Sequence, residues 1–159
     1  MIVEGSDHGE LRGTQLQPRQ LIDLTYTAGW AETKNLHTAV SVWFAESDGF
    51  DHAFNDNLDD TGNVVSRDCG IAQVNIPAAE IGTDAETRLY DPATCLAAAR
   101  KLWLDRKFEP WVAFNTGVYK HPVYSTRAAL GLMNWALGEM GGVTVPVFTL
   151  ADLRAKKLW

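Results

Sequence analysis

Residues 31–47 read AETKNLHTAVSVWFAES, and their apolar members recur with the spacing of an amphipathic helix. Four positions at i, i+3, i+4 and i+7 form one apolar stripe: Leu36, Ala39, Val40 and Trp43. Glu46 follows three residues after Trp43 and extends that stripe. Burial disfavours a charged carboxylate, and a helix C-terminus does not stabilise negative charge. We therefore expect Glu46 at the edge of a core with a raised pKa, although the same pattern also fits a helix end that meets solvent.

Further periodic segments predict a mainly helical domain with a small β-hairpin. A first helix is expected from about Pro18 to before Gly29, with Leu21, Ile22, Leu24 and Tyr26 facing inward. Another is expected in DPATCLAAARKLWLDR after a cap at Asp91, one after Ser125 or Thr126, and a short last one in residues 150–159. The turn signal DDTGN precedes a run, VVSRDCGIAQVNI, that predicts short strands.

Length and composition limit the classes of protein to consider. The chain has 159 residues, enough for one domain, and we assign residues 1–15 to a flexible arm or linker and residues 16–159 to the domain. A net charge of −6 without a basic block argues against nucleic-acid binding. No apolar run is long enough to insert into a membrane, and the N-terminal residues lack the pattern of a secretory signal.

The two cysteines, Cys69 and Cys95, are expected to be reduced and packed. They form no CxxC motif, and the four histidines are scattered. We therefore expect no metal site and no cofactor.

Four local motifs follow one another along the chain. They are Glu46-Ser47 at a helix end, GIAQ at residues 70–73 within SRDCGIAQVN, AFNTG at residues 113–117, and Tyr124 after Pro122. Each is weak alone, since an isolated GIAQ is usually a turn where backbones approach closely. Their order and spacing carry the information.

In this order the motifs resemble those of the lysozyme-like superfamily, which includes soluble lytic transglycosylases and g-type and c-type lysozymes. The transglycosylase pattern of Glu-Ser, Gly-Leu-x-Gln, Ala-Tyr-Asn-x-Gly and a downstream Tyr is matched over about residues 16–137. Phe114 replaces the usual Tyr, which removes a hydroxyl. AGW at residues 28–30 also resembles phage-type members.

The segment ESDGFDHAFNDN…SRDCGIAQVN is in addition similar to the c-type pattern. This resemblance implies an α+β lysozyme-like fold, in which the helical domain and a hairpin lobe form a substrate cleft. It makes Glu46 the acid and Asp68 the second carboxylate, and it implies a set of substrate-binding residues: Ser47, Asn57, Gln73, Asn75, Phe114, Asn115 and Tyr124. Asp68 could instead form a surface ion pair with its neighbour Arg67.

The resemblance implies cleavage of the β-1,4 bond between N-acetylmuramic acid and N-acetylglucosamine in peptidoglycan, by hydrolysis or by formation of a 1,6-anhydro end. It implies action at the bacterial cell wall, as a phage endolysin or a virion-associated lysin. An attached wall-targeting domain or virion tail proteins are the expected partners. Two alternatives stay open: a non-catalytic glycan-binding or structural module that keeps the fold, and an enzyme for a chitin-type polymer.

Overall fold

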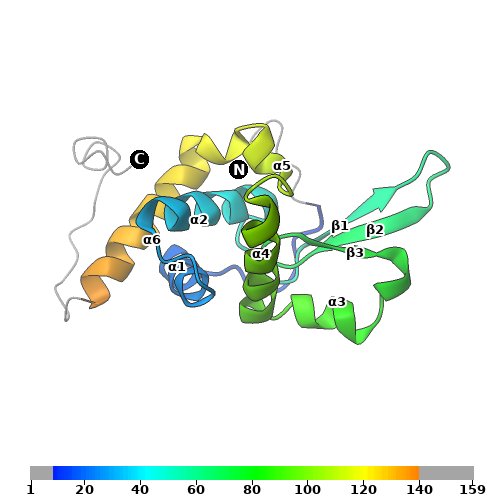
Figure 1. The fold of residues 1–159 in the computed structure, drawn as a ribbon, viewed down its shortest axis with the longest axis horizontal. Coiled ribbons are helices and arrows are strands. Elements are labelled where there is room, and N and C mark those ends of the chain that lie inside the picture. Colours follow the sequence, from blue (N-terminus) through cyan, green and yellow to red (C-terminus); the bar gives the residue numbers. More distant parts are fainter. Residues whose placement is uncertain (1–8, 140–159) are drawn as a thin grey trace.

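The computed structural model describes residues 9–139, which form a mixed α+β fold. Helices α1, α2 and α6 pack together at one end of the molecule, and the sheet with α3 lies at the other (Figure 1). The elements in chain order are α1 Pro18–Thr27, α2 Thr33–Ser47, β1 Phe54–Leu58, β2 Val64–Cys69, β3 Val74–Pro77, η1 Ala78–Glu80, α3 Asp84–Leu89, α4 Pro92–Arg106, α5 Val112–Asn115, η2 Val118–Lys120 and α6 Pro122–Glu139.

The core is built around α2, as the apolar stripe predicts. All four stripe residues are buried, at 0–1% exposure. The Trp43 ring meets Trp30 edge-on at 5.6 Å and Trp111 at 5.1 Å, so the three rings form one aromatic cluster. The Trp111 indole N–H donates to the carbonyl of Ala72 at 2.7 Å, which extends this cluster to the turn before β3.

The three strands form one antiparallel sheet in the order β1-β2-β3. The predicted turn at DDTGN is confirmed: the Asp59 carboxylate accepts hydrogen bonds from the backbone N–H groups of Thr61 at 2.8 Å and Asn63 at 2.9 Å. The Thr61 hydroxyl also donates to this carboxylate at 2.6 Å, and this bond, followed by that from the Asn63 N–H, lowers the pKa of Asp59 to about 2. The sheet has a third strand beyond the predicted hairpin, because the chain turns back at residues 70–73 and pairs again with β2.

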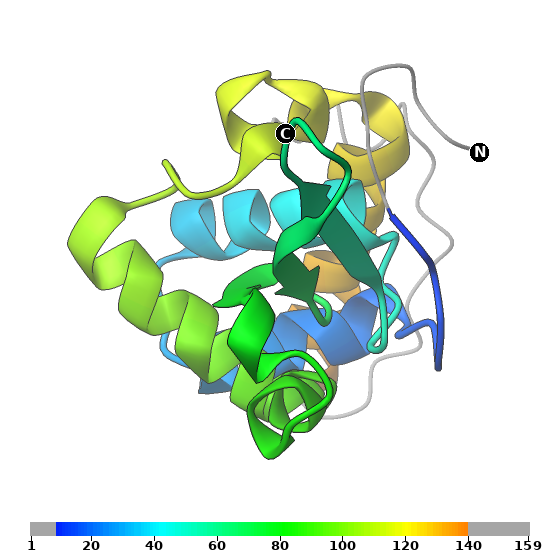
Figure 2. The same cartoon turned by 90° about the vertical axis from the view of Figure 1, so that its right-hand side faces the viewer.

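Residues 9–15 differ from the predicted flexible arm, whereas residues 1–8 lie outside the described part of the chain. Residues 9–15 run alongside the stretch of chain that connects α2 to β1 (Figure 2). Backbone hydrogen bonds join Glu10 to Phe54 in both directions, at 2.7 and 3.0 Å. The Asp51 N–H donates to the Thr14 carbonyl, and the His52 N–H donates to the Arg12 carbonyl, both at 3.1 Å. Backbone pairing that a polar sequence does not reveal therefore holds these residues in place.

Helix boundaries agree with the predictions for α1, α2 and α4, and Asp91 caps α4 by accepting from the Thr94 N–H at 2.9 Å. Tyr26 was predicted to face inward but is 43% exposed. Helix α6 begins at Pro122 and not after Ser125 or Thr126, because Pro suits a first helical turn and the His121 ring accepts from the Val123 N–H at 3.2 Å. The helix predicted for residues 150–159 lies outside the described residues.

Both cysteines are free and buried, as predicted. The Cys95 thiol donates to the carbonyl of Cys69 at 3.7 Å. No helix among residues 9–139 combines the length and the apolar character needed to cross a membrane.

Candidate active site

Glu46 lies in the last turn of α2, at the position that the stripe predicts, and is only partly buried. Its Oε1 atom accepts a 2.8 Å hydrogen bond from the backbone N–H of Ala113. Ala113 stands in the first turn of α5, whose early N–H groups have no partner within the helix. The carboxylate therefore occupies the junction between α2 and α5 with one oxygen fixed.

The next two residues tie the same helix end to other parts of the fold. The Ser47 hydroxyl is buried, 2.8 Å from the carbonyl oxygen of Ile71 and 3.0 Å from that of Trp43, and it accepts from the Gly49 N–H at 3.2 Å. Ser47 was predicted to bind substrate, but its hydroxyl points into the protein and joins α2 to the turn before β3. Its position makes it a support for Glu46.

Asp48 ends α2 in the left-handed conformation, with φ of 51°. Its carboxylate pairs with Arg127 of α6, whose guanidinium also lies 3.9 Å from the centre of the Phe44 ring. The Gln15 amide donates to the Asp48 carbonyl at 2.8 Å. The end of α2 is thus fixed from three sides: Glu46 contacts α5, Ser47 contacts the β2–β3 turn, and Asp48 contacts α6.

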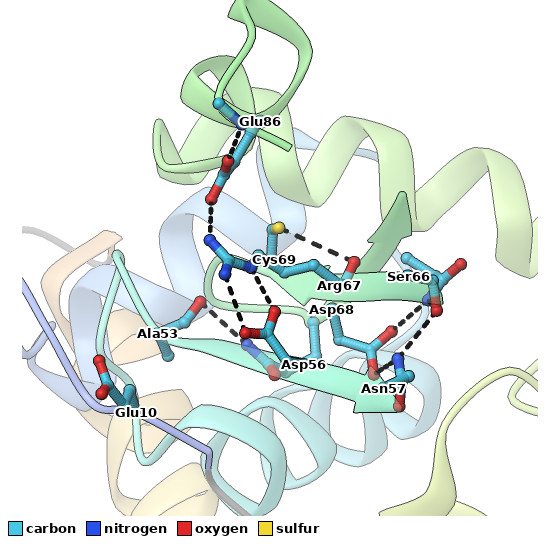
Figure 3. Close-up of polar contacts among 12 residues, drawn as sticks. Glu10, Ala53, Asp56, Asn57, Ser66, Arg67, Asp68, Cys69 and Glu86 are labelled. Carbon is cyan, nitrogen blue, oxygen red and sulfur yellow. Dashed lines mark hydrogen bonds and ion pairs between the residues drawn. The ribbon is translucent and has the colours of Figure 1, made fainter. Parts of the chain in front are cut away.

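Away from the end of α2, a cluster of polar side chains lies on one face of the sheet and contains Asp68. The Asn57 side-chain amide donates to Asp68 Oδ2 at 3.0 Å, and that of Asn75 donates to Oδ1 at 2.8 Å. Both amides also donate to the Ser66 hydroxyl, at 3.1 and 3.0 Å. The cluster spans all three strands because Asn57 pairs with Ser66 and Asp68 with Asn75 (Figure 3). The Asp68 carboxylate is thereby held in one orientation.

Arg67 lies on the opposite face of the sheet, since successive strand residues alternate. Its guanidinium binds both oxygens of Asp56, at 2.6 and 2.9 Å, and Glu86 Oε1 at 2.9 Å (Figure 3). Burial disfavours the charged Glu86 carboxylate, but hydrogen bonds from Tyr90, Gly82 and Arg67 outweigh it and lower the pKa. Arg67 therefore has its own partners, and the alternative of an Arg67–Asp68 ion pair is not found among the described residues.

Gln73 was predicted to bind substrate, and the structure shows it in the turn between β2 and β3. Its backbone is left-handed, with φ of 47°. The side-chain amide nitrogen donates to the carbonyls of Gly70 at 2.8 Å and Ala53 at 3.1 Å. Gly70 is needed in this turn because an added Cβ would lie 2.1 Å from the Leu89 carbonyl oxygen. The Gln73 nitrogen is thus committed to holding the turn.

The remaining predicted site residues belong to α5 and α6. The Phe114 ring stacks between Phe108 at 4.9 Å and Tyr119 at 5.1 Å, so it belongs to an aromatic stack. The Asn115 amide is exposed and donates to the Glu109 carbonyl at 2.8 Å. Tyr124 is fully buried in the first turn of α6.

Sequence reasoning missed two groups at these positions. Ser66 accepts from both amides beside Asp68, and its spacing of two residues from Asp68 on β2 could have revealed their common face. The N–H of Ala113 carries no side-chain signal, so its contact with Glu46 could not have been read from the residue type. Val112, next to it, is 64% exposed at the same junction.

Within residues 9–139, no group of three or more His, Cys, Asp or Glu side chains is placed to hold a metal ion. No protein-family model matches this chain, and a search of curated proteins finds no match. The geometry around Glu46 and around Asp68 is therefore the basis for assigning a function.

Proposed function

We propose that this chain cleaves the glycan strands of peptidoglycan at the β-1,4 bond between N-acetylmuramic acid and N-acetylglucosamine. The observation that carries the proposal is the fixed, partly buried carboxylate of Glu46 at the α2–α5 junction. The sheet supplies a second oriented carboxylate, Asp68, and the Ser47–Ile71 contact ties the turn after β2 to the Glu46 end of α2. A pair of carboxyl groups, one acid and one carboxylate, is what glycoside cleavage requires.

Glu46 acts as the general acid in this proposal. A backbone N–H can only donate, so the bond from Ala113 engages the unprotonated oxygen, Oε1. The proton of the acid form is then carried on Oε2, from which it passes to the glycosidic oxygen of the leaving sugar.

Asp68 stabilises the oxocarbenium-like transition state or attacks it as a nucleophile, after which water completes hydrolysis. The alternative route uses the N-acetyl group of the substrate, followed by attack of the muramyl 6-hydroxyl to leave a 1,6-anhydro end. The amides on both Asp68 oxygens support the first route, because they hold the carboxylate in a fixed position.

Substrate contacts are proposed for Asn57, Asn75 and Asn115, whose amides can bond to sugar hydroxyl or acetamido groups. Tyr124 is proposed to steady the acetamido group or Glu46. We place the activity at the bacterial cell wall, as that of a phage endolysin or a virion-associated lysin. With a net charge of −6 the chain is poorly suited to approach an anionic wall, which favours an attached targeting domain or a virion partner.

The test is the release of soluble fragments from purified cell walls by the wild type and by Glu46→Gln. The substitution keeps the shape of the side chain but removes the proton donor, so the rate should fall by about 10²–10⁴-fold. Glu109→Gln, at an exposed residue near α5, is the matched control and should retain the wild-type rate. Unchanged solubilisation by Glu46→Gln would exclude the proposal, and an inactive wild type that still binds walls would favour the glycan-binding module. Chitin oligomers, assayed in parallel, separate the chitin-type alternative.

A further inference from the structure

Residues 48–53 form a connector between the helix that carries Glu46 and the sheet that carries Asp68. They follow Ser47, the last residue of α2, and lead into β1. The connector forms turns and not a helix or a strand, so its backbone groups depend largely on partners from other segments. The placement of the sheet against the end of α2 therefore depends on what holds this connector.

An N-terminal strap, residues 9–16, runs antiparallel to the connector and contacts both of its ends (Figure 2). At the helix end, the Gln15 side-chain amide donates to the Asp48 carbonyl at 2.8 Å. At the sheet end, Glu10 and Phe54 exchange two backbone hydrogen bonds. The strap therefore bridges the connector from the residue after α2 to the first residue of β1.

The middle of the connector is bonded to the strap as well. The backbone hydrogen bonds run from the Leu16 N–H to the Gly49 carbonyl at 2.8 Å, from the Asp51 N–H to the Thr14 carbonyl at 3.1 Å, and from the His52 N–H to the Arg12 carbonyl at 3.1 Å. The Asp51 side chain adds an anchor, because its Oδ1 atom accepts from the Thr14 N–H at 2.8 Å. This side chain is only 13% exposed, so the bond is largely shielded from water. The strap thus supplies partners along the whole connector.

Two glycines allow the strap to lie this close. Gly9 has a φ of 57°, and a Cβ at this position would overlap the carbonyl oxygen of Phe54. Gly13 has a φ of 81°, and a Cβ there would overlap the Asp51 carboxylate. Both positions need glycine for conformation and for space. The strap is therefore fitted to the connector in sequence as well as in hydrogen bonding.

We propose that the N-terminal strap is a positioning segment of the active site, which fixes the connector and thereby holds Asp68 in its place relative to Glu46. This role rests on the proposed cleavage of glycan strands. No strap residue contacts the substrate in this proposal. A misplacement of about 1 Å between reacting groups can cost about a hundredfold in rate. Loosening the strap should therefore lower kcat, whereas KM should change less because the amides on the sheet stay in place.

Hydrogen exchange of the full chain tests whether the strap holds the connector. The amides of His52 and Phe54 donate to strap carbonyls, so in the wild type they should exchange at least about tenfold more slowly than unprotected amides. Asp51→Ala removes the side-chain anchor and should speed their exchange by about fivefold. Asp51→Asn keeps an acceptor oxygen for the Thr14 N–H and should restore most of the protection.

The same variants are then assayed on soluble peptidoglycan oligomers, at a temperature at which unfolding curves show each variant to be folded. Asp51→Ala and Gly9→Ala should lower kcat by about tenfold and leave KM within about threefold of the wild type. Asp51→Asn should recover most of the kcat. Gly82→Ala is the matched control: its φ is 79°, and no atom of the described residues lies within 4 Å of the added Cβ. It carries a similar backbone cost without displacing the strap and should keep the wild-type kcat.

The outcomes separate this role from the proposed function. Rapid exchange of the His52 and Phe54 amides in the wild type would overturn the role of the strap. Faster exchange in Asp51→Ala at an unchanged kcat would overturn it too and would leave glycan cleavage intact. Equal losses of kcat in Gly9→Ala and Gly82→Ala would mean a general backbone effect and would also overturn it. A wild type that cleaves no glycan would overturn the proposed function and the role of the strap with it.

Discussion

Glu46 Oε1 accepts a 2.8 Å hydrogen bond from the N–H of Ala113, although 67 residues separate the two along the chain. The bond joins the last turn of one helix to the first turn of another, where unpaired backbone N–H groups are available. It helps to orient the carboxylate.

The first prediction concerns the amide cluster around Asp68. Asp68→Asn places an amide where both Asn57 and Asn75 donate, so one hydrogen bond is lost and the free energy of unfolding should fall by about 1 kcal/mol. The rate of wall cleavage should fall by about 10²–10³-fold, because transition-state charge loses its stabiliser. Both are measured on the same preparation, by denaturant unfolding and by release of soluble wall fragments.

Asp60→Asn is the matched control, since Asp60 is exposed in the turn between β1 and β2. It should change neither quantity. A cleavage rate for Asp68→Asn within threefold of the wild type would contradict the catalytic role of Asp68 and support assistance by the substrate's own N-acetyl group.

The second prediction concerns the buried hydroxyl of Ser47. Ser47→Ala leaves the Ile71 carbonyl without this donor and should lower the free energy of unfolding by about 1–3 kcal/mol. Cleavage should slow as well, because Ser47 fixes the helix end next to Glu46. Ser41→Ala is the control: that hydroxyl donates only to the His37 carbonyl in its own helix, and its loss should cost less than about 1 kcal/mol. Equal effects of the two substitutions on stability would contradict the bridging role.

Sequence patterns predict some parts of this arrangement well and others hardly at all. The burial of α2 follows from its apolar stripe, because hydrophobic spacing reports directly on which helix face is covered. The direction of a polar side chain is a tertiary property. Ser47, Gln73 and Asn115 have residue types suited to a sugar site, yet each donates to a backbone carbonyl of its own chain. Carbonyl positions depend on the packing of turns, which residue type does not encode.

The same limit applies to the N-terminal segment and to the start of α6. Residues 9–15 are polar and carry no strand pattern, but a neighbouring stretch of chain offers backbone partners. At α6, Ser125 resembled a cap, whereas its hydroxyl lies 3.2 Å from the His121 carbonyl inside a helix that has already begun. In both cases the partners of the backbone hydrogen bonds cannot be recognised from the residue types.

The third prediction is a pH dependence of stability that arises from His37. Burial lowers the pKa of this histidine from its ordinary value of 6.5, although its hydrogen bond to the Ser125 carbonyl at 3.2 Å opposes the shift. The unfolded chain therefore binds a proton more readily than the folded one, and stability falls as the pH drops below about 6.5. His37→Gln should reduce this slope between pH 6.5 and 5 in denaturant unfolding. An identical slope in the variant would contradict the assignment to His37.

The fourth prediction concerns thiol reactivity. Burial raises the pKa of Cys95 to about 12, and burial together with the charge of Glu86 raises that of Cys69 to about 12. Against the ordinary value of 9.0, the thiolate fraction at pH 8 is about a thousandfold lower. A disulfide reagent should therefore modify the native protein very slowly and the denatured protein at once. Fast modification of two thiols in the native state would contradict the packing of both residues.

The most direct test of glycan cleavage is mass spectrometry of the glycan ends that the wild type and Glu46→Gln release from purified peptidoglycan. We expect new muramic acid ends with the wild type and at least about a hundredfold fewer with the variant. Reducing ends identify hydrolysis through Asp68, and 1,6-anhydro ends, lighter by one water, identify the route assisted by the substrate. Release of peptide fragments without new glycan ends, or equal numbers of ends from both proteins, would contradict the role of Glu46 as the general acid.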